Sequence, residues 1–201
     1  MPTAHIRSPR RLCIFCGSAP GRNPAFTTAA EELGRDLARR GIGLVYGGAT
    51  VGLMGVLADA ALGAGGEVVG VIPESLMARE IGHTGLTKLH VVRSMHERKA
   101  LMAELADGFV ALPGGFGTFE EFFEVVTWAQ LGLHAKPCSL LNIAGFFDPL
   151  LQLLDAAVAE GFIKPAARQS VLVESSVAGL LERLAALPAP LPHGKIDPRK
   201  I

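Results

Sequence analysis

The sequence predicts an α/β protein built on a doubly wound parallel sheet of about seven strands, with helices on both faces. Short apolar runs rich in β-branched residues recur along the chain, and a segment of helical periodicity follows most of them. These runs are apolar on both faces, as strands buried in parallel sheets are. Glycine, serine and proline cluster where the runs end, so they would meet at the carboxyl edge of the sheet, where such sheets hold their ligands.

The expected elements alternate along the whole chain. In the first half we expect strands at 12–18, 43–48, 67–73 and 88–92, helices at 25–41 and 52–63, and an irregular segment over 74–87. In the second half we expect strands at 108–115, 138–143 and 170–175, and helices at 95–106, 119–131, 149–161 and 177–187. We therefore expect one domain over 11–187, with a flexible extension at 1–10 before it and a mobile, proline-rich tail at 188–201 after it.

Composition excludes several classes of protein. The chain has 201 residues, 49% of them apolar and 19% charged, which is typical of a globular domain. The formal net charge is zero, so no basic surface for nucleic acid is expected. The uncharged stretch at 41–58 is too rich in glycine for a membrane helix. The N-terminus lacks the apolar core of a secretory signal, so we expect a cytoplasmic protein.

Cysteine and histidine do not indicate a metal or redox site. Cys13 and Cys16 form a CxxC, but they lie in an expected strand, where residues three apart point to opposite faces. Core packing therefore explains them better than redox or metal chemistry. The six histidines are scattered and form no HExxH motif. We expect no metal and no cofactor.

The stretch LPGGFGTFEEF, at 112–122, is the strongest local signal. Glycines between a strand and a helix let the backbone approach a ligand, and the helix start offers free N–H groups to an anion. Neither GxGxxG nor GxxxxGK[ST] is present, so one phosphate on a small molecule fits better than a dinucleotide or triphosphate. A structural turn is the alternative, with Thr118 as N-cap and Glu121 as N3 of a capping box. That box leaves Gly114, Gly115 and Gly117 unexplained.

A second stretch, SMHERKALMAELA, places an arginine on the apolar side of a helix. It also begins with a capping box, formed by Ser94 and Glu97. Arg98 shares its helical face with Leu101, Met102 and Leu105. A guanidinium on that face needs an anionic partner, either Glu121 or a bound phosphate, unless its side chain extends to the surface.

These two stretches resemble the motifs of the LONELY GUY (LOG) family of cytokinin riboside 5'-monophosphate phosphoribohydrolases. PGGFGTFEE fits the pattern PGGxGTxxE, and MHERKALM fits the motif that precedes it in the family. The resemblance runs from about residue 11 to 186 and includes FCGS, YGGATVGLMG, GVIP and VVTWAQLGLHAKP. It implies a Rossmann-like nucleotide-binding fold, a homodimer and hydrolysis of the N-glycosidic bond of a nucleoside 5'-monophosphate. The products would be the free base and ribose 5-phosphate.

The resemblance also implies roles for individual residues. Catalysis would belong to Arg98 and Glu121. The family's substrate contacts fall on Glu80, Arg98, Lys99, Gly115, Phe116, Gly117, Thr118, Phe119, Glu120, Glu121 and Thr127. Ser18, Gly48 and Gly114 are further candidates for contacts between the loops and the phosphate.

The chemistry that follows leaves some roles open. Breaking a ribosyl C–N bond builds positive charge on the sugar, by analogy with glycoside hydrolysis. The carboxylate of Glu121 would stabilise that charge or orient a water molecule. Arg98 could orient Glu121, hold the phosphate or ribose, or assist departure of the base.

Three other functions compete with this one. A general purine or pyrimidine monophosphate nucleosidase would share the mechanism, and a nucleotide-binding carrier without catalysis would share the glycine loops. The lysine decarboxylase label that is often attached to the family requires a Schiff-base lysine. Of six lysines in the chain, only Lys99 lies in a motif, which argues against that label.

Overall fold

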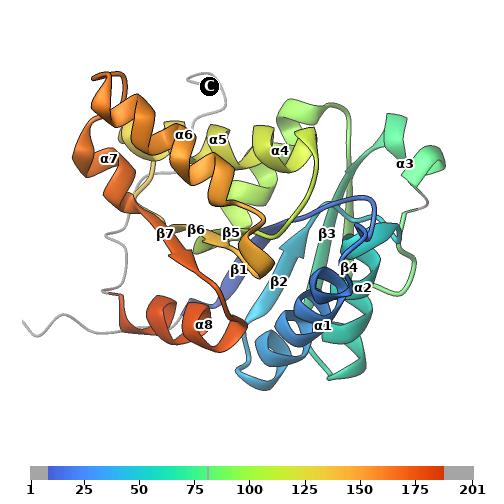
Figure 1. Cartoon of the computed structure of the whole chain (residues 1–201). Coiled ribbons are helices and arrows are strands. Elements are labelled where there is room, and N and C mark those ends of the chain that lie inside the picture. Colours follow the sequence, from blue (N-terminus) through green and yellow to red (C-terminus); the bar gives the residue numbers. More distant parts are fainter. Residues whose placement is uncertain (1–8, 81, 188–201) are drawn as a thin grey trace, which may run out of the picture.

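The structure is a computed structural model that describes residues 9–80 and 82–187, without the side chains of 78–80. Its centre is a seven-stranded sheet in which every neighbouring pair of strands is parallel (Figure 1). The strand order is β4-β3-β2-β1-β5-β6-β7. The strands are β1 (Arg11–Phe15), β2 (Gly43–Tyr46), β3 (Val68–Pro73), β4 (Lys88–Val92), β5 (Gly108–Ala111), β6 (Cys138–Leu141) and β7 (Val171–Glu174).

The strand order reverses direction once, between β1 and β5. Successive strands first add outward from β1 to β4, and the chain then returns to the other side of β1 to begin β5. In open α/β sheets, ligands bind outside the carboxyl ends of the strands at such a switch point. The predicted doubly wound, Rossmann-like parallel sheet is therefore confirmed, and its switch point lies between the two glycine-rich turns.

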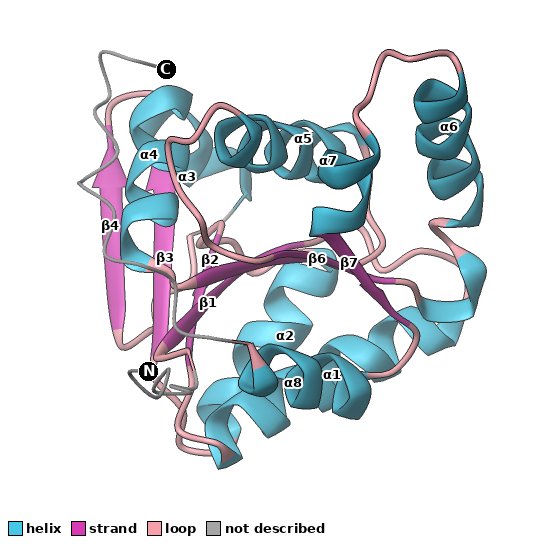
Figure 2. Cartoon of the chain, turned by 90° about the vertical axis from the view of Figure 1, so that its left-hand side faces the viewer, coloured by secondary structure: helices cyan, strands magenta, loops and turns pink. Residues whose placement is uncertain are grey.

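Helices cover both faces of the sheet (Figure 2). On one face lie α1, α2 and α8, and on the other lie α4 and α5. The α6 helix lies at the periphery, and Leu154 is its one buried residue. The helices are α1 (Pro24–Arg39), α2 (Gly52–Gly63), α3 (Glu74–Glu80), α4 (Met95–Leu105), α5 (Phe116–Gln130), the short 3-10 turn η1 (Ile143–Gly145), α6 (Asp148–Ala159), α7 (Pro165–Ser170) and α8 (Val177–Ala186).

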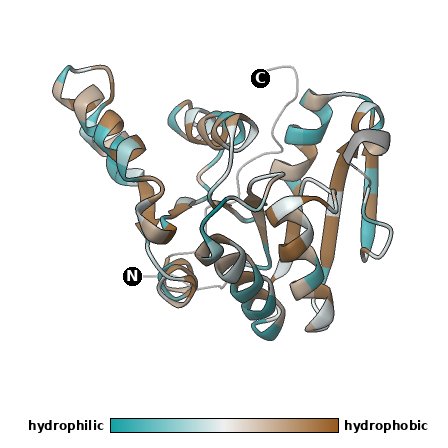
Figure 3. Cartoon of the chain, turned by 45° about the vertical axis from the view of Figure 1, so that its right-hand side comes forward, coloured by the Kyte–Doolittle hydropathy of each residue, from teal (hydrophilic) through white to brown (hydrophobic). Residues whose placement is uncertain are grey.

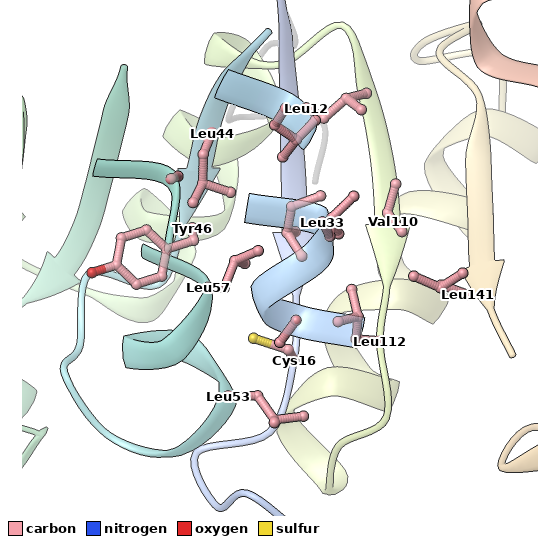
Figure 4. Close-up of a cluster of buried hydrophobic side chains, with 14 of the residues drawn as sticks. Leu12, Cys16, Leu33, Leu44, Tyr46, Leu53, Leu57, Val110, Leu112 and Leu141 are labelled. Carbon is pink, nitrogen blue, oxygen red and sulfur yellow. The ribbon is translucent and has the colours of Figure 1, made fainter. Parts of the chain in front are cut away.

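Two apolar cores lie on either side of the sheet. Leu12, Leu33, Leu57 and their neighbours fill the core under α1 and α2 (Figure 4). The second core joins the opposite strand faces to α4 and α5. Cys16 belongs to the first core and Cys13 to the second, so the CxxC does point to both faces, and both thiols are buried.

Several predicted boundaries were wrong. The segment over 74–87 was expected to be irregular, but it begins with the helix α3. No helix was expected at α7, yet Pro165 provides a helix start there, since proline suits the first helical position. The α5 helix begins at Phe116 instead of at residue 119. The extension expected at 1–10 lies almost entirely outside the described residues, and the tail at 188–201 lies wholly outside them.

Hydropathy follows the layers of the fold (Figure 3). The strands and the inward sides of the helices carry most of the hydrophobic residues, while polar residues line the outer helical faces. Among the described residues, no helix combines the length and the apolar character needed to cross a membrane.

Candidate active site

The two glycine-rich turns meet at the switch point of the sheet. The N–H of Gly17, just after β1, donates to the carbonyl of Pro113, just after β5, at 3.1 Å. A Cβ on Gly17 would lie 2.9 Å from the carbonyl oxygen of Ala19 and 3.3 Å from the Cα of Gly114. Glycine is therefore required here because the two backbones approach so closely. This contact brings together turns that lie almost a hundred residues apart.

A polar cleft of about 260 Å³ opens beside this contact. Arg98, from α4, and Glu121, from α5, both line it, so the two predicted catalytic side chains share one cleft. The other lining residues come from the turns after β1 and β5, the start of α5 and the helices that follow β2, β3 and β4. They are Cys16, Ser18, Met54, Leu76, Met95, Gly115, Phe116, Gly117, Thr118 and Glu120.

The start of α5 forms one wall of the cleft. Gly115 is the N-cap, and no side chain caps the helix. The predicted capping box is therefore wrong: Thr118 is the third helical residue, and Glu121 lies in the second turn. The first N–H groups of a helix have no acceptor within the helix, and the dipole favours an anion near them. The N–H groups of residues 116–118 lie at the cleft and suit a phosphate.

The three glycines of this turn serve two different purposes. A Cβ on Gly114 would lie 2.1 Å from Oγ1 of Thr118, so this glycine allows the turn to pack against the helix. A Cβ on Gly115 or Gly117 would meet no atom within 4 Å. Gly115 and Gly117 line the cleft, so the absence of side chains there exposes the backbone amides to whatever enters it.

Arg98 is buried, as predicted from its helical face, with only 6% of its surface exposed. The Nη2 group donates to the carbonyl oxygen of Gly47 at 3.2 Å, and Nη1 lies 3.8 Å from the Met95 sulfur. The Nε group is buried and finds no acceptor among the described residues. A buried donor in this state is costly unless a ligand satisfies it.

The capping box predicted at the start of α4 is confirmed in one half, since Ser94 Oγ accepts from the Glu97 N–H at 3.1 Å.

The cleft also contains a thiol, that of Cys16. Burial, and after it the negative charge of Glu121, raises the pKa of this thiol well above its ordinary value of 9.0. Cys16 therefore stays protonated near neutral pH and is no thiolate nucleophile. The chemistry of the cleft rests on its guanidinium, its carboxylates and its backbone amides.

Lys99 does not line the cleft. Its ammonium forms ion pairs with two carboxylates of α5, those of Glu120 and Glu124, and the distance to Glu124 is 2.9 Å. These pairs connect α4 to α5 directly beside Arg98 and Glu121. Sequence reasoning missed Glu124; its place one turn after Glu120 on the same helical face was the available signal.

Gly48, Phe119 and Thr127 were also predicted for the site but do not line the cleft. Gly48 adopts a φ of +79°, which accounts for glycine at that position. Phe119 packs on Phe146 and Phe147. Thr127 is exposed on α5, and its hydroxyl donates to the carbonyl of the residue four positions before it. Glu80 ends α3, and its side chain lies outside the described part of the structure.

The described structure also contains other cavities. An adjoining pocket of about 210 Å³ shares Ser18 and Gly115 with the cleft and includes Gly114 and the rings of Phe26 and Phe146. A larger cavity, of about 470 Å³, lies near the amino ends of β6 and β7 and contains none of the predicted site residues. Cavity volume alone would select this larger cavity, whereas the switch point of the sheet selects the cleft. Within residues 9–80 and 82–187, no group of histidine, cysteine, aspartate and glutamate side chains could hold a metal ion.

This geometry defines the class of the protein. The protein is an open α/β sheet with an uncapped helix start at its switch point, and an arginine and a glutamate line the same cleft. A family model described as "Possible lysine decarboxylase" matches residues 54–184. The chain belongs to the LONELY GUY family of cytokinin riboside 5'-monophosphate phosphoribohydrolases, as its relatives establish.

Two of these relatives cover most of the chain. A cytokinin riboside 5'-monophosphate phosphoribohydrolase of Rhodococcoides fascians is 57% identical over 175 residues, which is 87% of this chain and 88% of that protein. The LOG protein of Oryza sativa subsp. japonica, which bears the same functional name, is 51% identical over 87% of this chain and 72% of its own length. A molybdenum cofactor binding protein from Rippkaea orientalis has the same fold, with a TM-score of 0.65 and 22% identity over 87% of this chain and 94% of that one.

Proposed function

We propose that this protein hydrolyses the N-glycosidic bond of adenosine 5'-monophosphates, including those modified at N6, to free base and ribose 5-phosphate. The observation that carries the proposal is the shared cleft: Arg98 and Glu121 line it together, beside the exposed amides of the α5 start. The names of the relatives that are 57% and 51% identical support the same reaction. The likeness to a cofactor-binding protein concerns the fold alone.

The 5'-phosphate would bind at the start of α5. The N–H groups there and the helix dipole favour an anion, and Gly115 and Gly117 leave them open. Ser18, on the opposite turn, brings a hydroxyl to the same place. A phosphate in this position would put the ribose next to Glu121, which lies about one turn further along the helix.

Glu121 would act on the ribose as C–N cleavage proceeds. Positive charge develops at the anomeric carbon, and a carboxylate beside it stabilises that charge and orients the attacking water. The dipole effect fades within the first helical turn, so it does not account for the charge of Glu121. Arg98 lines the same cleft, and its positive charge favours the ionised form of a nearby carboxyl group.

We also propose a homodimer in the cytoplasm. Large apolar side chains on α5 and around α6 are exposed in one chain, among them Phe116 at 93% and Phe162 at 85%. Exposed groups of this kind are typical of subunit interfaces. The three described cysteines are free thiols, which suits a reducing compartment. Light scattering during gel filtration measures the mass of the particle, and a purely monomeric chain would rule out the dimer.

The experiment is a comparison of nucleotides with purified protein. AMP, isopentenyladenosine monophosphate and CMP are incubated separately, and the free base and ribose 5-phosphate are quantified by chromatography. The expected result is base release from the adenine nucleotides, and the ratio between them distinguishes a cytokinin enzyme from a general nucleosidase. Tight binding without release from any of the three would indicate a carrier and overturn the proposal.

Two variants test the assigned roles. Glu121→Gln and Arg98→Ala should each lower kcat by about 10²- to 10⁴-fold, the range for losing a group that assists charge or proton transfer. Glu182→Gln is the matched control, because Glu182 is exposed on α8, on the opposite face of the sheet. If Glu121→Gln or Arg98→Ala turns over at the wild-type rate, the catalytic roles are assigned wrongly, even when the wild-type protein does release base.

A further inference from the structure

Arg98 occupies an electrostatically unfavourable place on its own helix. It is the fourth residue of α4, where the positive end of the helix dipole disfavours a cation. It is also buried, so its hydrogen-bond donors need acceptors within the protein or on a ligand. Something outside α4 must therefore hold the guanidinium in the cleft.

The end of β2 supplies that support. The carbonyl oxygen of Gly47, the first residue after β2, accepts from Arg98 Nη2 at 3.2 Å. The Met95 sulfur, at 3.8 Å from Nη1, is a weak acceptor by comparison. The Gly47 carbonyl is thus the main acceptor for Arg98 among the described residues. The Nε group is buried and has no acceptor there, and Arg98 lines the cleft.

Glycine is required at position 47 for a reason different from that at position 48. Gly48 has a φ of +79°, whereas Gly47 lies outside the left-handed region. A Cβ on Gly47 would lie 2.2 Å from Arg98 Nη2 and 3.1 Å from the Met54 sulfur, whereas ordinary contacts begin at 3.4 Å. Alanine would thus fit the backbone but would occupy the place of the guanidinium.

We propose that Gly47 is a positioning residue for Arg98: its carbonyl holds the guanidinium, and its missing side chain leaves the space that the guanidinium fills. This inference deepens the proposed function and rests on it where catalysis is concerned. The end of β2 thereby sets the direction from which Arg98 faces the bound nucleotide, although Gly47 itself does not line the cleft.

The experiment compares Gly47→Ala with Gly63→Ala. Gly63 is the matched control because it lies at the end of α2, and a Cβ there would meet no atom within 4 Å. With AMP as the substrate, Gly47→Ala should lower kcat on the order of 10²-fold, the effect of moving a catalytic group by about 1 Å. KM should change much less, since the helix start that binds phosphate is untouched. Gly63→Ala should match the wild type.

A second measurement does not depend on activity. Lysine lacks Nη2, so Arg98→Lys should remove the overlap that Gly47→Ala creates. The midpoint of urea unfolding should therefore fall in Gly47→Ala and rise again in the double variant Gly47→Ala/Arg98→Lys. Turnover in the double variant should be no lower than in Arg98→Lys alone. The NMR resonance of the Arg98 Nε–H group should also shift in Gly47→Ala and stay unchanged in Gly63→Ala.

The outcomes separate this inference from the proposed function. If the wild type releases no base, the function fails, while the unfolding midpoints and the Nε–H resonance still decide the role of Gly47. If Gly47→Ala turns over at the wild-type rate and leaves that resonance in place, the inference is overturned. If Gly47→Ala does not fold, recovery of folding by Arg98→Lys supports the inference, and lack of recovery overturns it.

Discussion

Replacing Lys99 by methionine should destabilise the protein more than replacing either of its partners by glutamine. The Lys99 side chain is 10% exposed and pairs with Glu120 and Glu124, whose side chains are 53% and 23% exposed. Oε2 of Glu124 is buried and finds no donor among the described residues. Without the lysine, two carboxylates one helical turn apart on α5 would repel each other, and one of them is mostly buried.

The magnitude follows from the burial of each group. Breaking a fully buried ion pair costs about 3–5 kcal/mol, and the partial exposure of Glu124 lowers our estimate for Lys99→Met to about 2–3 kcal/mol. Glu124→Gln keeps the shape of the side chain and leaves Lys99 its pair with Glu120, so it should cost about 1 kcal/mol. Glu120→Gln removes an exposed pair and should cost about 0.5 kcal/mol.

The assay is a double-mutant cycle measured by urea unfolding and by thermal unfolding at pH 7. Lys99→Met should lower Tm by about 4–12 °C for a chain of this size, and adding Glu124→Gln should restore part of the loss. Burial alone would lower the pKa of Lys99, but the hydrogen bonds that its ammonium donates to Glu120 and Glu124 raise the pKa overall above 10.5. Its contribution is therefore present below pH 10.5 and is lost as the pH rises through the higher folded pKa. A loss below about 0.5 kcal/mol in Lys99→Met, within the range of an exposed pair, would refute this reasoning.

Two further predictions concern stability. The hydrogen bond from Arg11 lowers the pKa of Glu67 below 4.5, so this pair stabilises the fold above pH 4.5 and is lost as the pH falls through the lower folded pKa. Acid titration of Glu67→Gln against the wild type should show the two curves converging at low pH, and parallel curves would contradict it. Gly34→Ala in α1 would place a Cβ 2.4 Å from the Leu57 carbonyl oxygen, so it should cost about 1–3 kcal/mol in thermal unfolding despite the better helix propensity of alanine. An increase in Tm would contradict this prediction, because it would show that α1 and α2 move apart without a loss of stability.

Most of the fold was predictable from the sequence. All seven strands lie where the apolar, β-branched runs occur. The five central strands leave a continuous apolar pattern because they are buried on both faces, whereas the edge strands β4 and β7 are only partly buried. The boundaries were less predictable. The turn PGGFGT contains a strong N-cap residue, Thr118, but the close approach of Gly114 to that threonine lets the helix begin earlier, at Phe116. A contact between residues four apart outweighed the capping signal of Thr118.

Local patterns predicted features that one helix or one turn determines. The helical face of Arg98 indicated burial, and the glycines indicated exposed amides at a helix start. The partners of these groups could not be read from local patterns. Gly47 contacts Arg98, and Glu124 contacts Lys99, although each pair is far apart in the chain. The local sequences YGGAT and FFEVV contain no pattern that predicts these partners.

The amino-acid sequence by itself determined the α/β class, the parallel sheet, the burial of Arg98 and the family, because these depend on periodicity and on motifs read within one segment. Only the tertiary structure decided that Arg98 and Glu121 share a cleft, that Lys99 is held by two carboxylates, and that the Gly47 carbonyl supports the guanidinium. The physical reason is that the strand order places the ends of β1, β2 and β5 side by side, and contacts across that edge join residues whose separation in the chain carries no local signal.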